Sequence, residues 1–193
     1  MPKLEKRKKF IVLTCILTVF LIAFFSELTI LRKKTKSSDN YVLLYFAKAN
    51  SNTSSLHPQL TTINLPTTVF NNTSEQSIIL IQYIQAVLEE LIKGPVETDS
   101  ELIPTIPTNT KVNSVIINEN TAYIDFSREI VDDFWGGADN EKLTIYSIVN
   151  TVTQFSPIKQ VQISVEGSSD VSIGGHYLLD RPFKRNNNLI QYK

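Results

Sequence analysis

Two histidines, His57 and His176, are the residues of this chain best suited to acid–base chemistry. His176 lies four residues before Asp180, so the two side chains could form an acid–base couple. The alternative is that Gly174-Gly175 makes a tight turn, in which His176 and Asp180 bind backbone groups. We favour this structural role, and the sequence predicts no catalytic residue.

Other patterns of reactive residues point to no chemistry. No cysteine or histidine spacing indicates a structural zinc site. Asp132, Asp133 and Asp139 do not have the spacing of an EF-hand calcium loop, so a solvated acidic loop is the simpler interpretation. The sequence contains no G-x-S-x-G motif, phosphate-binding loop or dinucleotide fingerprint. We therefore expect no metal and no cofactor, and we expect Asp125 to form local hydrogen bonds.

The acidic stretch from Ser127 to Asn140 contains two neighbouring aromatic residues, Phe134 and Trp135, followed by two glycines. Trp135 could fold back over the core. It could instead anchor a partner protein, because tryptophan is enriched among interface hot spots. The sequence leaves both possibilities open, and Phe134 and Trp135 are the candidate partner-binding residues.

Strands and helices alternate around this loop. Apolar runs predict strands at residues 41–47, 112–117, 122–126 and 158–165, the middle two forming a hairpin whose asparagines suit positive φ. Apolar residues at helical spacing predict helices at 72–93 and 141–155. Residues 50–72 are expected to be a long loop with one irregular strand near 63–65. This β-α-β-β-α-β order predicts an α+β fold, with two amphipathic helices on one face of a small mixed or antiparallel sheet.

The first predicted helix has clear signals at both ends. Asn72 and Glu75 match a capping box. Gly94 can take the left-handed conformation that closes a helix, and Pro95 cannot continue it. Residues 97–109 then form a long connection to the hairpin, which prolines keep extended.

The amino-terminal part has a different character. Residues 10–26 carry no charge, and with Glu27 near the far headgroups, residues 10–31 are long enough to span a membrane. A cleaved signal peptide is the alternative, but no A-x-A-like site follows. Cys15, the only cysteine, lies in this segment, which suits an extracytoplasmic domain without disulfides.

Charge is unevenly distributed along the chain. Nine of the 19 basic residues but only three of the 19 acidic residues precede Tyr41, so the remainder has a net charge of −6. This acidic body argues against nucleic-acid binding. We expect five regions: a basic cytoplasmic amino terminus (1–9), a transmembrane anchor (10–31), a linker (32–40), a folded domain (41–183) and a flexible tail (184–193).

Seven stretches occur in the order and spacing of a known family. They are YVLLYF (41–46), LIKGP (91–95), IPTNTKVNSV (106–115), TAYIDFS (121–127), IYSIVNTVTQF (145–155), IKQVQISVEG (158–167) and GGHYLLDRPF (174–183). Together they resemble the GerMN family, the sporulation and spore germination domain, as a single domain. The resemblance implies a ring-building-motif-like fold and a structural role for the motif residues Gly94, Pro95, Pro107, Thr110, Asp125, Phe126, Thr151, Gly167, Gly175, His176, Pro182 and Phe183.

The resemblance also implies a bacterial, non-enzymatic, extracytoplasmic protein. Together with the predicted anchor, it suggests a single-pass protein of the cell (inner) membrane. Such a protein would act as an adaptor or scaffold, binding another envelope protein or itself in a sporulation- or germination-like complex. Two alternatives remain open: an envelope enzyme acting on cell-wall polymer, and a ligand-binding sensory module that partners a membrane receptor.

Overall fold

The computed structural model describes residues 18, 21, 40–49, 54–63, 73–96 and 101–192. The chain divides into two compact units, residues 1–39 and 40–193, and the fold described below is that of the second unit. Apart from Thr18 and Leu21, the expected anchor at 10–31 lies outside the described residues, as does Asn72 of the expected capping box. Among the described residues, no helix is both long and apolar enough to cross a membrane.

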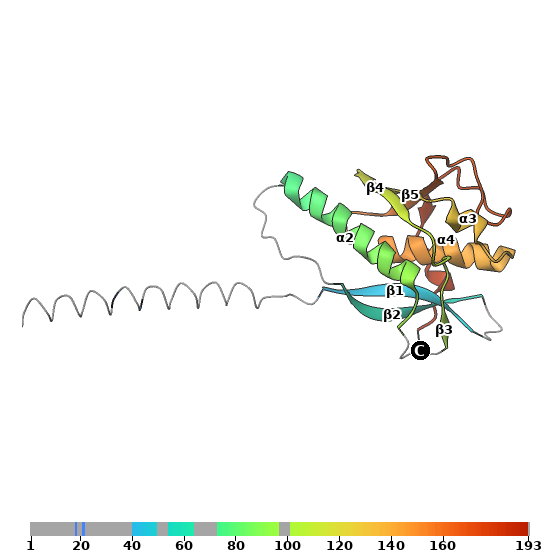
Figure 1. The fold of residues 1–193 in the computed structure, drawn as a ribbon, viewed down its shortest axis with the longest axis horizontal. Helices are drawn as coiled ribbons and strands as arrows, with labels where there is room; N and C mark the ends of the chain where they lie inside the picture. The colour runs from blue at the N-terminus through green and yellow to red at the C-terminus, as the bar shows by residue number, and fades with distance from the viewer. Residues whose placement is uncertain are drawn as a thin grey trace, which may run out of the picture. The chain divides into compact units, whose positions relative to one another are not determined.

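An antiparallel sheet of three strands opens the folded unit (Figure 1). Its order is β2 (Leu56–Ile63), β1 (Asn40–Lys48) and β3 (Leu102–Ile103). The expectation of a loop was wrong for the described residues 54–63, because β2 pairs with β1 along its whole length. Apart from Ile63, the irregular strand expected near 63–65 lies outside the described residues. The serine-, threonine- and proline-rich composition was misleading: Pro58 is accommodated because β2 lies at the edge of the sheet, where a missing N–H is tolerated.

A second sheet contains β4 (Val112–Asn118), β5 (Thr121–Phe126), β6 (Gln160–Val165) and β7 (Phe183–Lys184), in that order. The β4–β5 hairpin is confirmed, and β6 pairs with β5 in parallel. The positive φ of the hairpin turn, 53°, falls on Glu119 and not on an asparagine. Asn120 instead donates a hydrogen bond to the Pro157 carbonyl oxygen at 2.7 Å. The α+β class is therefore confirmed, but with two sheets where one was expected.

The helices are α2 (Thr73–Lys93), the single turn α3 (Glu129–Asp132) and α4 (Ala138–Val152), with a short 3₁₀ helix, η1 (Asn187–Leu189), near the end. Helix α2 contacts β1 and β4, and α4 contacts β1, β6 and α2, so the helix layer touches both sheets. In Figure 1, α2 and α4 lie on the same side of the three-stranded sheet. The inward side chains of β5 and β6 complete the core. They are Ala122, Ile124, Phe126, Val161, Ile163 and Val165.

Three helix ends are informative. Gly94 has a φ of 94° directly after α2, as expected for a left-handed helix terminus. Helix α4 begins at Ala138, three residues before the expected start, because Gly137 completes the turn that leads into it. It ends at Val152, and not at Phe155.

The segment expected to be a flexible tail packs on the first sheet in its described part. The Arg185 guanidinium donates hydrogen bonds to the Tyr45 hydroxyl at 2.5 Å and to the Asn150 carbonyl oxygen at 2.6 Å. The Gln191 backbone N–H donates to the Leu56 carbonyl oxygen at 2.9 Å. Sequence polarity suggested a loose tail, whereas these polar groups have partners on β1, β2 and α4.

Candidate functional site

The loop between α3 and α4 presents the two aromatic residues in different ways. Phe134 packs against the core, and the backbone of Gly174 approaches it so closely that a Cβ atom there would lie 2.6 Å from the Phe134 ring. Gly136 and Gly137 both have positive φ, which turns the chain into α4. Phe134 is thus fixed from both sides, and it supports the residue that follows it.

Trp135 is half exposed, at 50%. Its ring lies at a tilt of 33° to the Phe134 ring, with 5.6 Å between centroids. Phe134 therefore supports one part of the indole, and another part faces solvent. Neither sequence interpretation of Trp135 is complete, because this side chain is supported by the core and is also available to a partner.

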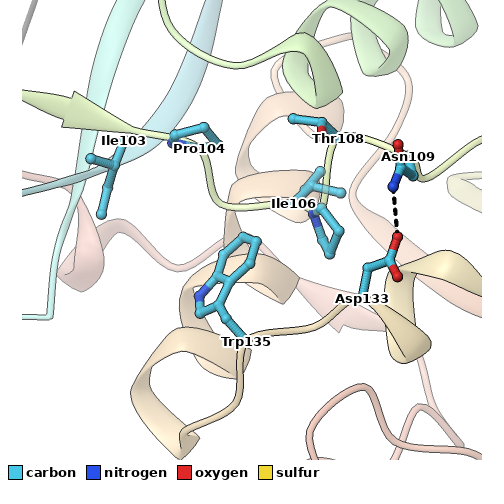
Figure 2. Close-up of a pocket in the computed structure, with 8 residues that line it drawn as sticks. Ile103, Pro104, Ile106, Thr108, Asn109, Asp133 and Trp135 are labelled. Carbon is cyan, nitrogen blue, oxygen red and sulfur yellow. Dashed lines mark hydrogen bonds between the residues drawn. The ribbon is translucent and has the colours of Figure 1, made fainter.

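A wall of residues from the α2–β4 connection faces Trp135 (Figure 2). Ile103, Pro104, Ile106 and Pro107 supply apolar surface, while Thr108, Asn109 and Asp133 supply the polar side chains. With Trp135 they enclose an open hollow of about 490 Å³. Asn109 donates a hydrogen bond to the Asp133 carboxylate at 2.9 Å, which joins the two walls.

Buried hydroxyl groups attach this wall to α4. Thr105 donates to the Ser147 hydroxyl at 2.8 Å, and Ser147 donates to the Thr144 carbonyl oxygen at 2.9 Å. The Thr144 hydroxyl in turn bonds to the Thr105 carbonyl oxygen at 2.6 Å. All three side chains are buried. The connection 97–109 was expected to be a spacer, but its described part, from Glu101 onward, forms one side of a surface site.

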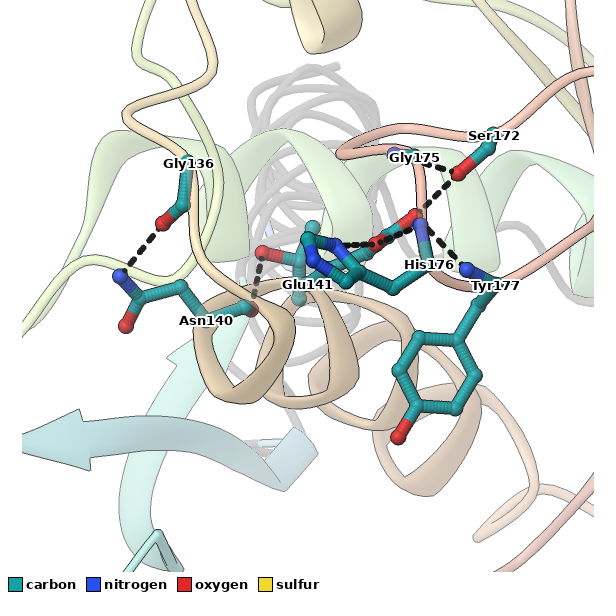
Figure 3. A network of polar contacts seen from close by, with 8 residues as sticks. Gly136, Asn140, Glu141, Ser172, Gly175, His176 and Tyr177 are labelled. Atoms are coloured by element: carbon teal, nitrogen blue, oxygen red, sulfur yellow. Dashed lines mark hydrogen bonds and ion pairs between the residues drawn. The ribbon is translucent and has the colours of Figure 1, made fainter.

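His176 contacts Glu141 and not Asp180 (Figure 3). Its Nδ1 lies 3.1 Å from a Glu141 carboxylate oxygen, and its backbone N–H donates to the same oxygen at 2.9 Å. The couple with Asp180, which we did not favour, is absent from the hydrogen bonds of the described residues, and Asp180 is exposed. His176 therefore bonds to a buried carboxylate, and not to the backbone groups that we expected as its partners.

Glu141 is fully buried in the first turn of α4 and was missed by the sequence analysis. Burial alone would raise its pKa. Hydrogen bonds from Ser172 and from the backbone N–H groups of Gly174, His176 and Tyr177 lower the pKa, and the net result lies below the ordinary value. The Ser172 hydroxyl is 2.6 Å away. This carboxylate is a buried anchor for the loop, with its hydrogen-bonding capacity taken up by protein groups.

Asp125 joins three segments of the second sheet. It accepts hydrogen bonds from the Ser164 hydroxyl and the Gly167 N–H, both at 2.7 Å, and from the Asn113 amide at 3.0 Å. Burial would raise its pKa, but these bonds lower it overall. The local role expected for Asp125 agrees with this geometry.

The other motif residues are spread over the fold and do not converge on one site. Gly94 and Pro95 follow α2, and Pro107 lines the hollow. Phe126 and Thr151 are buried in the core, as is Thr110. Gly175 donates its N–H to Ser172 at 2.7 Å, beside His176. Pro182 is exposed, and the Phe183 ring packs edge-on to Tyr146. Within the described residues, no group of three or more histidine, cysteine or acidic side chains could hold a metal ion.

Comparison with protein families gives a match to the Germane family, sporulation and spore germination, over residues 43–171. The chain belongs to this family. The resemblance to GerMN domains is thereby confirmed. The matched region of this Germane protein begins within β1 and contains β2 to β6, α2 to α4, the Trp135 hollow and Glu141. No curated protein matches the chain.

Solved structures of similar fold are also found. The tandem GerMN domains of the sporulation protein GerM from Bacillus subtilis share 22% identity at a TM-score of 0.57, and the alignment covers 78% of this Germane chain and 47% of the tandem chain. The first GerMN domain of that protein shares 20% identity at a TM-score of 0.47, and the alignment covers 77% of this chain and 98% of that domain. A candidate lipoprotein from Clostridium perfringens shares 26% identity at a TM-score of 0.49, and the alignment covers 76% of this chain and 87% of the lipoprotein chain. The tandem-domain structure supports the assignment of the fold, and nothing beyond the fold.

Proposed function

We propose that this chain is a membrane-anchored, extracytoplasmic adaptor of a cell-envelope complex, and that it binds its partner protein through the Trp135 hollow. The observation that carries the proposal is a half-exposed tryptophan, supported from behind by Phe134, at the mouth of an open apolar hollow. Partly exposed aromatic side chains on rigid supports are typical anchors of protein interfaces. The family's association with sporulation and germination suggests the kind of complex.

The geometry of the reactive residues favours binding over catalysis. An enzyme acting on cell-wall polymer would need His176 and an acid to converge in a cleft. Here the partner of His176 is Glu141, whose side chain is fully buried and bonded to Ser172 and backbone groups. A carboxylate in that setting positions a loop, so it supplies no reactive group to a substrate.

The shape of the hollow favours a protein partner over a small ligand. A sensory module would enclose its ligand, as small-molecule sites usually bury most of the ligand surface. The Trp135 hollow is open, and two of its apolar residues, Ile103 and Trp135, remain exposed at its rim. Such a surface can receive the side chains of another protein.

Co-purification of the full-length protein from its own membranes tests the proposal. Trp135→Ala should remove the partner, while Tyr123→Ala should keep it. Tyr123 is a matched control because it is also an exposed aromatic residue but belongs to the second sheet. Since Trp135 is half exposed, its loss should cost roughly half of the 3–5 kcal/mol typical of a buried aromatic residue, which leaves the domain folded. Thermal unfolding of the same samples checks this. Retention of the partner by Trp135→Ala would refute the proposal.

A further inference from the structure

We infer that the Trp135 hollow receives a cationic side chain, an arginine or a lysine, from a segment of the partner protein. The inference rests on the proposed function and specifies the chemistry of the partner. It follows from the charge in the hollow, from the exposed indole and from the backbone of the facing wall.

The hollow carries a single charge. Of the eight lining residues, all in the described part of the chain, only Asp133 is charged. One of its carboxylate oxygens accepts the Asn109 hydrogen bond at 2.9 Å, and no described residue bonds to the other. Asp133 is exposed in the free domain, and a partner that covers it beside these apolar walls would lower the local dielectric constant and so strengthen its attraction to an opposite charge.

The hollow also presents an aromatic ring. Trp135 has the best aromatic ring for a cation–π contact, and such contacts strengthen when the cation is partly desolvated. Ile103, Pro104 and Ile106 can cover the aliphatic stem of an arginine or lysine, whose charged group would then lie between the indole and Asp133 (Figure 2). Apolar walls, an indole and one carboxylate together complement both parts of a long cationic side chain.

The backbone of the facing wall is poorly suited to binding an added strand. An added strand needs a row of free N–H groups. Pro104 and Pro107 have none, and β3, at the edge of its sheet, is only two residues long. A partner segment therefore gains few backbone hydrogen bonds here, and side-chain recognition must supply the specificity.

The surroundings of the hollow have the matching sign. The stretch from Ser127 to Asn140 contains four acids, Glu129, Asp132, Asp133 and Asp139, against one base, Arg128. The chain after residue 40 has a net charge of −6, as counted above. Complementary charge of this kind speeds and orients association with a basic partner surface.

Fluorescence of the full-length protein in detergent micelles tests the inference directly, because Trp135 is the only tryptophan of the chain. The probes are a short peptide alternating valine and arginine, and the same peptide with neutral citrulline in place of arginine. We expect the arginine peptide to shift the tryptophan emission saturably, and to bind at least fivefold more tightly than the citrulline peptide. Added salt should weaken the binding of the arginine peptide and leave the binding of the citrulline peptide unchanged.

Two variants of neighbouring acids identify the charge responsible. Asp133→Asn keeps an amide oxygen that can accept the Asn109 hydrogen bond. It should weaken the binding of the arginine peptide at least fivefold. Asp132→Asn removes an equal charge outside the hollow and should change the binding of the arginine peptide little. Equal binding of both peptides, no emission change with either, or unchanged binding by Asp133→Asn would overturn the inference. So would an emission change on diluting the protein alone, which would indicate a second copy as the occupant.

The membrane co-purification separates this inference from the proposed function. If Asp133→Asn keeps the native partner while Trp135→Ala loses it, the docking surface stands and the cationic partner residue is refuted. If both variants keep the partner, both proposals fail. If both lose it and both remain folded, both are supported.

Discussion

Glu141 shows what a single buried carboxylate can do for a fold of this kind. It lies at position i of a helix whose residues i+4, i+7 and i+11 are Ile145, Ile148 and Val152, all fully buried. A charge in an apolar stripe is visible in the sequence, and it indicates a buried acid that needs donors. The donors come from the Ser172–Tyr177 loop, whose position cannot be derived from helical periodicity.

Replacing this acid should give a pH-dependent loss of stability. Glu141→Gln should lower the free energy of unfolding by about 1–3 kcal/mol near neutral pH, because buried donors lose a charged acceptor. The folded-state pKa of Glu141 lies below its ordinary value of 4.5, so its contribution is present above that pH and is lost as the pH falls through the folded-state pKa. The difference between the two proteins should therefore shrink below about pH 4.5.

Denaturant titrations across pH measure this difference. The low pKa of Asp125 is common to both proteins, so its contribution largely cancels in the comparison. A difference that stays constant down to strongly acidic pH would show that Glu141 contributes through packing and not through its charge.

At the scale of the element, Gly94 ends α2 and also allows the hollow wall to pass close by. Its φ is 94°, and a Cβ atom there would lie 3.1 Å from Pro104 Cγ. Gly94→Val should lower the free energy of unfolding by about 1–2 kcal/mol, because valine is strained in the left-handed conformation. The close contact with Pro104 should increase this loss. Gly94→Asn should cost less, because asparagine tolerates this conformation. Equal melting temperatures for the wild type and the valine variant would contradict this role.

The hydroxyl pair that attaches the wall to α4 makes a second prediction about an element. Ser147→Ala leaves the buried Thr105 hydroxyl without its acceptor and should cost about 1–3 kcal/mol. Thr105→Val should cost about 1 kcal/mol, since Ser147 still donates to Thr144. The double variant should cost less than the two single costs added together, by about 1 kcal/mol. Additive costs in a double-mutant cycle would show that the two hydroxyl groups act independently.

Local patterns predicted some elements and missed others, for identifiable reasons. Gly94-Pro95, the β4–β5 hairpin and the inward face of β6 follow from short-range spacing, and the structure agrees. The β2 strand was missed because its turn-forming residues are tolerated at a sheet edge. The division into two sheets depends on which strands pair, a long-range choice that periodicity does not encode.

The candidate site was only half predictable for a related reason. Trp135 was identified by its residue type and its glycine-rich loop. The facing wall, from Ile103 to Asn109, was taken for a spacer because its prolines indicate only an extended chain. Its role as a wall depends on Thr105 reaching Ser147, a contact across 42 positions of sequence.

At the scale of the whole molecule, the proposed function requires that the domain stays attached to a membrane. The predicted anchor at residues 10–31 should remain in the mature protein, because its uncharged part, residues 10–26, is apolar and the whole segment is long enough to span a bilayer with Glu27 near the headgroups. Carbonate extraction of native membranes should leave the full-length chain in the pellet, with a peripheral protein released as control. A mature chain that begins after residue 31 would contradict this prediction.

The central claim is that the partner binds at the Trp135 hollow. Site-specific photo-crosslinking in native membranes tests it most directly, with a benzophenone amino acid replacing either Ile103 or Tyr123. The two positions are equally exposed, at 42% and 41%, but only Ile103 borders the hollow. The account predicts a crosslinked partner from position 103, its loss on adding Trp135→Ala, and none from position 123. Equal adducts from both positions, or an adduct from position 123 alone, would contradict it.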